Sequence, residues 1–285
     1  MKLLSWNIQW GKGMDGRVDL PRIIRTIQRQ GDFDIICLQE VAINFPGLPG
    51  SRGENQFDRL SSALNGYTGI YGIAIDVPDR CGGRNLFGNA IYSRFPIGQV
   101  WRHLLPWQAE LKIPSMQRVL IEAVIYTDLG AVRVMTTHLE YYSQHQRENQ
   151  INAIRDLHRN ACATSRRKSM KGEEGGPFEV FPRPEQAVLC GDLNFPAWAL
   201  EHTQIIAPFE EGIPNFCDAW QALHPDTHHP PTVGIHPVDF VDRPECFDFI
   251  FVTDGLIPRL KTHGIDMMTQ ASDHQPIWVE FEKDK

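Results

Sequence analysis

Several apolar segments of this sequence end in side chains that can bind a metal ion or move a proton. The segment "AVLCG" is followed by Asp192 and Asn194, which would share one face if the chain is extended there. Three other apolar segments also end in such residues, namely Asn7, Glu40 and His138. Asp273 and His274 come just before the last apolar segment. Because loops at strand ends commonly build binding sites, we expect these side chains to converge at one edge of a sheet.

These residue types suit a metal-assisted reaction at phosphorus. Mg²⁺ takes oxygen ligands and keeps several waters, and Glu40 and Asp273 supply carboxylates. An attacking water needs a base, and His274 is of the side-chain type that titrates near neutral pH. Negative charge on the phosphoryl oxygens needs hydrogen-bond donors or a cation. The candidates for that role are Asn7, Asn194, His138 and Arg118, which opens the segment "RVLIEAVI".

Taken singly, most of these residues have a simpler interpretation. Asp192 is a common turn residue, Glu40 suits a solvated strand end, and His138 suits a hydrogen-bonded core position. Asp248 differs, because it lies inside the apolar run "CFDFIFV", where a carboxylate without a partner would be costly. We expect His274 to be that partner. The recurrence of polar strand ends therefore favours a site over a set of unrelated turns.

Runs of β-branched and aromatic residues separated by turn residues predict the strands that would carry these groups. The clearest runs are residues 2–8, 33–41, 68–75, 88–93, 118–126, 131–139, 187–193, 247–252 and 276–281. Apolar residues at helical spacing predict helices over residues 144–162 and 57–64. A further helix is expected after Asp19, which can cap it, with Pro21 in its first turn and a stop at Gly31.

Strands outnumber helices in this pattern, and the helices fall between groups of strands. That order predicts an α/β sandwich with two packed sheets and helices outside. Residues 118–139 have the pattern of an antiparallel hairpin that turns at Asp128–Gly130, so we expect mixed or antiparallel sheets. We expect one domain over residues 1–285, with an exposed mobile loop at 165–186 and a second irregular stretch at 224–245.

Composition excludes some classes of protein. With 285 residues, 42% hydrophobic and 22% charged, the chain has no apolar stretch near the roughly 20 residues of a membrane helix. Its first residues lack the features of a signal peptide, so we expect a cytoplasmic protein. The net charge of −7 argues against coating of nucleic acid but leaves room for a nuclease with a local basic groove. The six cysteines lack metal-site spacing, and we expect buried thiols.

Three other groups of residues admit two interpretations each. Three histidines have zinc-like spacing, but nearby prolines favour a polar loop on the substrate side; they are His224, His228 and His229. A basic cluster could contact nucleic acid or an anionic membrane, or be a solvated loop; it comprises Arg166, Arg167, Lys168 and Lys171. An aromatic group could stack on a base or sugar, or pack in the core; it comprises Tyr141, Tyr142 and Trp198.

A set of short motifs, in their order along the chain, is similar to that of a known family. The motifs are "WN", "LQEV", "GNAIYSRFPI", "THL", "GDLN", "FDFIF" and "SDHQP". Together they resemble the endonuclease/exonuclease/phosphatase superfamily, which includes DNase I-like nucleases, neutral sphingomyelinases and inositol polyphosphate phosphatases. The resemblance extends from Leu3 to Phe281. It implies a four-layered α/β sandwich, in agreement with the pattern of strands and helices.

The resemblance also implies roles for individual residues. Glu40 in "LQEV" is similar to the main metal-binding carboxylate, with Asn7 beside it. Asp273 is similar to a second group at the metal or the phosphate. His274 resembles the catalytic histidine, and Asp248 in "FDFIF" resembles the acid that orients its imidazole.

The remaining similarities concern the water and the phosphate. Asp192 and Asn194 resemble the pair that positions the nucleophilic water and the scissile phosphate. His138 resembles a phosphate contact or transition-state donor, and Asn89 and Arg118 occupy positions that often contact the site. The segments after "WN" and "GDLN" depart from those of abasic-site nucleases and DNA-tyrosyl phosphodiesterases, and they identify no substrate.

We therefore predict a phosphohydrolase that depends on Mg²⁺ or Mn²⁺, and we favour a phosphodiesterase. Its substrate would be a phosphate ester, with nucleic acid among the candidates, and the sequence indicates no protein partner. The same core would also serve a phosphomonoesterase or a sphingomyelinase- or phospholipase C-like enzyme. A non-catalytic binding protein on this fold is a further alternative. The sequence leaves open whether Asp192 or His274 is the base.

Overall fold

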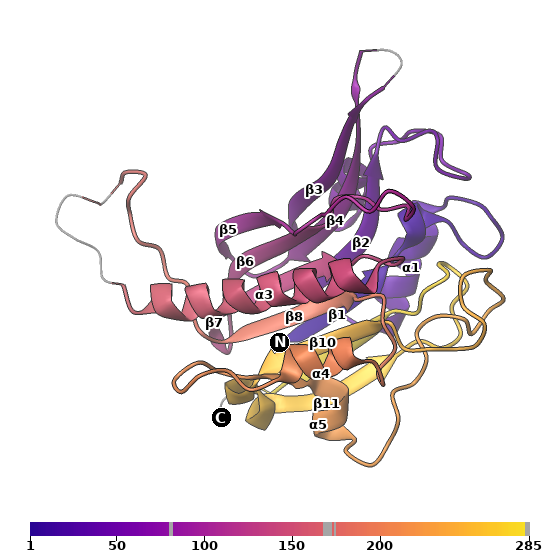
Figure 1. The fold of residues 1–285 in the computed structure, drawn as a ribbon. Coiled ribbons are helices and arrows are strands. Elements are labelled where there is room, and N and C mark those ends of the chain that lie inside the picture. Colours follow the sequence, from indigo (N-terminus) through magenta and orange to yellow (C-terminus); the bar gives the residue numbers. More distant parts are fainter. Residues whose placement is uncertain (80–81, 168–172, 174, 283–285) are drawn as a thin grey trace.

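Two mixed β-sheets packed face to face form the body of the protein, and helices cover their outer faces (Figure 1). The structure is a computed structural model that describes residues 1–79, 82–167, 173 and 175–282. It confirms the predicted α/β sandwich and its mixed strand order. Within the described ranges, no helix is long and apolar enough to cross a membrane.

The first sheet places the strand nearest the C-terminus inside the sheet rather than at its edge. Its strands are β1 Lys2–Asn7, β2 Ile35–Ile43, β3 Thr68–Pro78, β4 Arg84–Ser93, β11 Leu260–Ile265 and β12 Ile277–Phe281. Their order is β11-β12-β1-β2-β4-β3. β1 pairs in parallel with β2 and antiparallel with β12, so the first and last strands of the chain lie side by side.

The second sheet carries the predicted hairpin. Its strands are β5 Ile97–Leu104, β6 Val119–Thr127, β7 Gly130–His138, β8 Ala187–Asp192, β9 Phe216–Asp218 and β10 Asp248–Thr253. Their order is β5-β6-β7-β8-β10-β9, and the β7–β8 pair is parallel. β6 and β7 pair antiparallel with Thr127 opposite Gly130, which confirms the predicted turn.

The two long predicted helices form close to their expected bounds. The helices are α1 Leu20–Gln30, α2 Gln56–Ala63, α3 Gln144–Ser165, α4 Leu200–Ile206 and α5 Ala219–Leu223, with 3-10 helices at Gln9–Gly11 and Asp254–Arg259. The Asp19 carboxylate accepts a hydrogen bond from the amide of Arg22 and caps α1, which ends before Gly31. α3 continues to Ser165, beyond its predicted end.

Alternating side chains along the strands divide the apolar residues into layers. The central core lies between the sheets and contains Leu3 and Ile35 from the first sheet and Val134 and Val188 from the second. α1 packs on the outer face of the first sheet. α3 and α4 pack on the outer face of the second. The layer order is therefore helix, sheet, sheet, helix, as the family resemblance implied.

Some segments differ from their prediction or were not predicted. β5, β9, β11, α4 and α5 are short or lack strong periodicity, and no sequence signal singled them out. In the segments 165–186 and 224–245, the described residues contain no helix or strand beyond the last residue of α3. Lys168, Lys171 and Cys81 lie outside the described residues. The described cysteines have free thiols, and all but Cys217 are buried.

Candidate active site

The polar strand ends converge on one cavity of about 410 Å³. The predicted residues that line it are Glu40, Arg118, His138, Asp192, Asn194, Asp273 and His274. Asn7 and Asp248 lie behind this lining and hydrogen bond to it. Asn89 is not among the lining residues; its Nδ2 atom donates to the carbonyl of Val119 at 3.0 Å, beside Arg118.

His274 and Asp248 form a buried hydrogen-bonded pair. Nδ1 of His274 lies 2.8 Å from Oδ2 of Asp248, the first residue of β10. The main chain of His274 is held as well, because the indole Nε1 of Trp6 donates to its carbonyl at 2.9 Å. The other carboxylate oxygen of Asp248, Oδ1, is buried without a hydrogen-bond partner. The pair thus fixes the imidazole and points its Nε2 atom toward Asp192, 3.6 Å away.

The charges around His274 favour its protonated form. Burial alone would lower the pKa of His274, but the carboxylates of Asp248, Asp192 and Asp273 raise it well above its usual value. Burial raises the pKa of Asp192 to about 6, although the charge of His274 opposes this effect. The two groups therefore form an interacting pair in which a proton can lie on either side.

Glu40 lies within β2. The prediction that Glu40 ends this strand is therefore wrong. The strand continues to Ile43, but the pairing register with β4 shifts between Leu38 and Val41. Glu40 has a φ of +60°, and this local irregularity turns the carboxylate into the cavity. Its Oε1 atom accepts a hydrogen bond from Nδ2 of Asn7 at 3.1 Å.

Asn7 links the two sheets at the site. Besides Glu40, its Nδ2 atom donates to Oδ2 of Asp192 at 2.9 Å. Burial, together with the negative charge of Asp273, raises the pKa of Glu40 to about 7. Burial likewise raises the pKa of Asp273. The cavity therefore holds several carboxylates at close range, and this arrangement favours a bound cation or a shared proton.

Asp192 and Asn194 lie in a tight turn and do not share the face of an extended strand. Asn194 has a φ of +55°, and its amide N–H donates to Oδ1 of Asp192 at 3.0 Å. Its Nδ2 atom donates to the carbonyl of Leu139 at 2.8 Å. Asp192 and Asn194 therefore belong both to a turn and to the candidate site, because the turn directs both side chains into the cavity.

His138 and Arg118 line the same cavity as His274. Nε2 of His138 lies 3.4 Å from Oδ2 of Asp192, and Nδ1 lies 3.6 Å from Oε1 of Glu40. Burial, with the positive charge of Arg118, lowers the pKa of His138 well below its usual value, which favours the neutral ring. Arg118 Nη2 lies 3.5 Å from Glu140, while its Nε and Nη1 atoms are buried without partners.

The sequence of this chain matches one family model along almost its entire length. The model describes the endonuclease/exonuclease/phosphatase family, and the match covers residues 4–274. The chain belongs to this family. A comparison with curated protein sequences found no significant match.

Solved structures with the same fold include other members of the endonuclease/exonuclease/phosphatase family. One from Beutenbergia cavernae is 22% identical, with a TM-score of 0.66 over 98% of this chain and 70% of that one. A mannosyl-6-phosphatase from Bacteroides thetaiotaomicron is 19% identical, with a TM-score of 0.64 over 99% of both chains. Humanized TDP2 from D. rerio is 17% identical, with a TM-score of 0.63 over 99% and 98% of the two chains. At these identities the likeness shows the fold.

Members of this family typically depend on a divalent metal ion, and the donor set of the cavity fits one. Glu40 presents a partly buried carboxylate and Asp273 a buried one, and the charge of Asp273 raises the pKa of Glu40, as described above. A hard divalent cation would relieve this repulsion and would accept oxygen ligands from both residues. Asn7 lies close enough to contribute its side chain, because it already bonds to Glu40.

The other walls of the cavity are apolar, and sequence reasoning missed most of them. They include Trp10, Phe45, Ile75, Phe87, Met116 and Phe240. Phe240 comes from the segment 224–245 and stacks nearly parallel to His274, with ring centroids 6.2 Å apart and an interplanar angle of 13°. The hydroxyl of Tyr141 donates to the carbonyl of Phe240. These residues lie in loops or on strands without a local signal that could have identified them.

The remaining sequence candidates divide between the active-site cavity and other parts of the surface. Tyr141 and Tyr142 line the cavity, whereas Trp198 lines a separate one. In the basic cluster, Arg166 pairs with Glu185 at 3.5 Å and Arg167 pairs with Glu173 at 2.7 Å. For these two arginines the structure supports the solvated, ion-paired loop.

Proposed function

We propose that this chain is a Mg²⁺- or Mn²⁺-dependent phosphodiesterase that hydrolyses a P–O bond with an activated water. One arrangement carries the proposal: the hydrogen-bonded pair of His274 and Asp248 faces Asp192 across one cavity, with Glu40 and Asp273 at its metal-binding side. When bound, the metal ion would supply Lewis-acid stabilisation of the phosphate and of the leaving oxygen. Glu40 and Asp273 would hold it, with Asn7 beside them.

Within this proposal, Asp192 is the base and His274 is the cationic donor. A raised pKa keeps His274 protonated near neutral pH, so its Nε2–H can donate to a phosphoryl oxygen. Asp192 is held by Asn7 and by the amide of Asn194, which leaves its orientation fixed. It accepts the proton of the water as the water oxygen bonds to phosphorus and the ester oxygen departs.

Further phosphate contacts would come from Arg118, His138 and Asn194, which also line the cavity. Arg118 has two buried nitrogen atoms without hydrogen-bond partners, and both could donate hydrogen bonds to a bound anion. Neutral His138 can donate one ring N–H to a phosphoryl oxygen without adding charge. Asn194 has a second amide N–H besides the one bonded to Leu139. These donors would hold the non-bridging oxygens as negative charge accumulates on them.

The charge of the cavity favours a diester over a monoester. Arg118 is the arginine that lines the cavity, and Glu140 already offsets part of its charge. A diester carries one negative charge on its phosphate, whereas a monoester carries up to two. The apolar wall formed by residues such as Trp10, Phe45 and Phe87 also offers a surface for the second ester substituent. A phosphomonoesterase stays the second candidate, because one structure of equal coverage is named a mannosyl-6-phosphatase.

The first experiment compares bis-p-nitrophenyl phosphate with p-nitrophenyl phosphate in the presence of Mg²⁺ or Mn²⁺. We expect metal-dependent cleavage of the diester, and we expect Glu40→Gln to lower kcat/KM by about 100-fold or more because a metal-binding charge is lost. Circular dichroism checks that the variant is folded. Cleavage of the monoester alone would favour the phosphatase. Undiminished activity of Glu40→Gln would contradict the proposed mechanism.

A further inference from the structure

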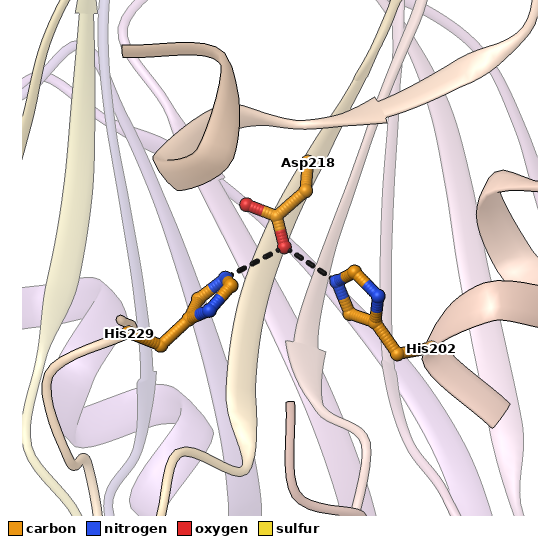
Figure 2. Close-up of side chains that lie close together, drawn as sticks. All are labelled: His202, Asp218 and His229. Atoms are coloured by element: carbon orange, nitrogen blue, oxygen red, sulfur yellow. Dashed lines mark hydrogen bonds and ion pairs between the residues drawn. The ribbon is translucent and has the colours of Figure 1, made fainter. Parts of the chain in front are cut away.

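A second group of metal-ligating side chains lies outside the proposed active site. His202 from α4, Asp218 at the end of β9 and His229 from the segment 224–245 point toward one another (Figure 2). Nε2 of His202 lies 2.8 Å from Oδ2 of Asp218, and Nε2 of His229 lies 2.9 Å from the same oxygen. The three potential ligand atoms all lie within 4.8 Å of one another.

This cluster places a negative charge in an apolar part of the protein. Asp218 is 4% exposed and His202 is 3% exposed, and both imidazoles lie against the ring of Phe249. The ion pairs found for Asp218 among the described residues are those with His202 and His229. Its second oxygen, Oδ1, accepts a hydrogen bond from the amide of Gln221. A buried carboxylate without an arginine or lysine partner is stabilised by a bound cation, by a protonated histidine or by hydrogen bonds from N–H donors.

A small void adjoins two of the three residues, Asp218 and His229. A void of about 10 Å³ is lined by Asp218, His229, Cys246 and His263, a volume near that of one water-sized probe. His263 has a buried Nδ1 atom without a hydrogen-bond partner. His229 and Cys246 also line a larger cavity of about 840 Å³.

We propose that His202, Asp218 and His229 bind one Zn²⁺ ion, with a water molecule from the adjoining void as the fourth ligand. Two imidazole nitrogens and one carboxylate oxygen are ligands that zinc prefers, and a tetrahedral site needs one more. Each imidazole would carry its proton on Nδ1 and present the lone pair of Nε2 to the ion. The charge of Asp218 is then balanced without protonation of either histidine.

The site would brace a segment that reaches the active-site cavity. His229 lies near the start of the segment 224–245, and Phe240 of the same segment stacks on His274. Between them, the hydroxyl of Thr232 accepts hydrogen bonds from the amides of Phe247 and Asp248. A zinc ion would tie this segment to α4 and β9, which come from other parts of the chain. Its role would be structural, and it does not depend on the identity of the substrate.

The test is a calorimetric titration. The intact chain is treated with a chelator and then titrated with Zn²⁺ in the presence of excess Mg²⁺. We expect one zinc ion per chain, and we expect His202→Gln and His229→Gln each to weaken binding by more than about 100-fold, because a ligand loss exceeds the 10–100-fold effect of outer-shell changes. Co²⁺ in place of zinc should give the visible absorption of a tetrahedral ion. At zinc concentrations about 100 times Kd, Tm should rise by roughly 5–10 °C.

The controls separate this site from the active site and from unfolding. His228→Gln changes a neighbouring histidine that lines the large cavity, and it should leave zinc binding unchanged. Glu40→Gln should also keep one zinc ion. The glutamine variants retain an N–H donor for Asp218, and circular dichroism checks their fold. Absence of stoichiometric zinc, or binding that Glu40→Gln removes and the histidine variants keep, would overturn the proposal and leave two N–H···O hydrogen bonds as the explanation.

Discussion

The carboxylate of Asp248 contributes through its hydrogen bond to His274. It lies behind the cavity, 2.8 Å from Nδ1 of the imidazole, and its role in the proposed mechanism is to orient and charge the ring. Without the carboxylate, the ring could adopt the other tautomer, and the pKa of His274 would fall because one of the charges that raise it is gone.

We therefore expect Asp248→Asn to lower kcat by roughly 10²–10⁴-fold with little change in KM, because a positioned proton-transfer group is disturbed. The measurement is a steady-state profile of diester cleavage between acidic and alkaline pH, in which the limb that reports His274 should move to lower pH. A matched control is Asp254→Asn, which changes a carboxylate at the other end of β10. Equal profiles for Asp248→Asn and the native protein would remove Asp248 from the mechanism.

At the scale of single elements, one glycine allows β8 to deliver Asp192. Gly191 has a φ of +144°, and a Cβ atom there would lie 1.9 Å from the carbonyl oxygen of Thr137 on β7. We expect Gly191→Ala to destabilise the protein by roughly 2–4 kcal/mol, because both the backbone strain and the clash oppose it. Urea denaturation measures the change.

Substitution of a second glycine, Gly66, separates the effect of backbone strain from that of the steric clash. Gly66 also has a positive φ, but a Cβ atom there would meet nothing within 4 Å. Gly66→Ala should therefore cost only about 1 kcal/mol, the conformational part of the effect. Similar losses of stability in the two variants would show that the close contact with β7 has little influence.

A buried ion-pair network joins β6 and β7. Glu122 is fully buried and accepts hydrogen bonds from Arg133 at 3.3 Å and from Arg183 at 2.8 and 2.9 Å. Burial would raise the pKa of Glu122, but hydrogen bonds from His103 and Arg183 and the charge of Arg133 lower it to about 2. Glu122→Gln should lower the free energy of unfolding at pH 7 by about 3–5 kcal/mol, because two arginines lose their counter-charge.

The same network predicts an acid dependence of stability. The pKa of Glu122 is lower in the folded than in the unfolded state, so its contribution is present above the unfolded value of about 4.3. It is lost as the pH falls through the folded value of about 2. Urea curves should therefore show the gap between native protein and Glu122→Gln narrowing below about pH 4. Asp76→Asn, at an exposed pair, should change stability by less than about 1 kcal/mol at every pH.

Local signals explain which elements the sequence could predict. The start and end of α1 follow from Asp19, Pro21 and Gly31. Most of the polar cavity residues could be predicted because their side-chain type and their position near strand ends are visible in the sequence. The irregular backbone of Glu40 could not be predicted, since a non-glycine residue with positive φ is maintained by its surroundings. Short elements such as β9 and α5 likewise depend on tertiary contacts more than on their own sequence.

Clusters built from distant segments were beyond sequence reasoning for a different reason. Within the segment 224–245 alone, the prolines argue against a metal site formed by its histidines. In the structure, His229 of that segment meets His202 and Asp218 from elsewhere, and the partners were not apparent from spacing. The apolar wall of the active-site cavity, with Phe240 at one end, has the same origin.

At the scale of the whole molecule, the candidate site straddles the two sheets. Asn7 and Glu40 belong to the first sheet, whereas His138, Asp192 and Asp248 belong to the second. The distance between the two halves of the site is therefore set by how the sheets pack. Any change at their interface acts on the site as well as on stability.

A buried hydrogen bond across this interface offers a direct test. Nε2 of Gln39 on β2 lies 2.9 Å from Oγ1 of Thr136 on β7. In a double-mutant cycle of Gln39→Leu and Thr136→Val, we expect a coupling energy of roughly 0.5–1.5 kcal/mol, measured by urea denaturation. Additive effects of the two substitutions would show that the contact does not join the sheets energetically.

The position of β12 has a consequence for how the chain is made in the cell. β12 lies between β11 and β1, so β1 lacks one of its neighbours until residues 277–281 have left the ribosome. Domains fold as units during synthesis, and Asp273 and His274 come just before this last strand. In a nascent chain the cavity would therefore stay incomplete, and one edge of β1 would stay open to chaperones and proteases, until this segment is translated.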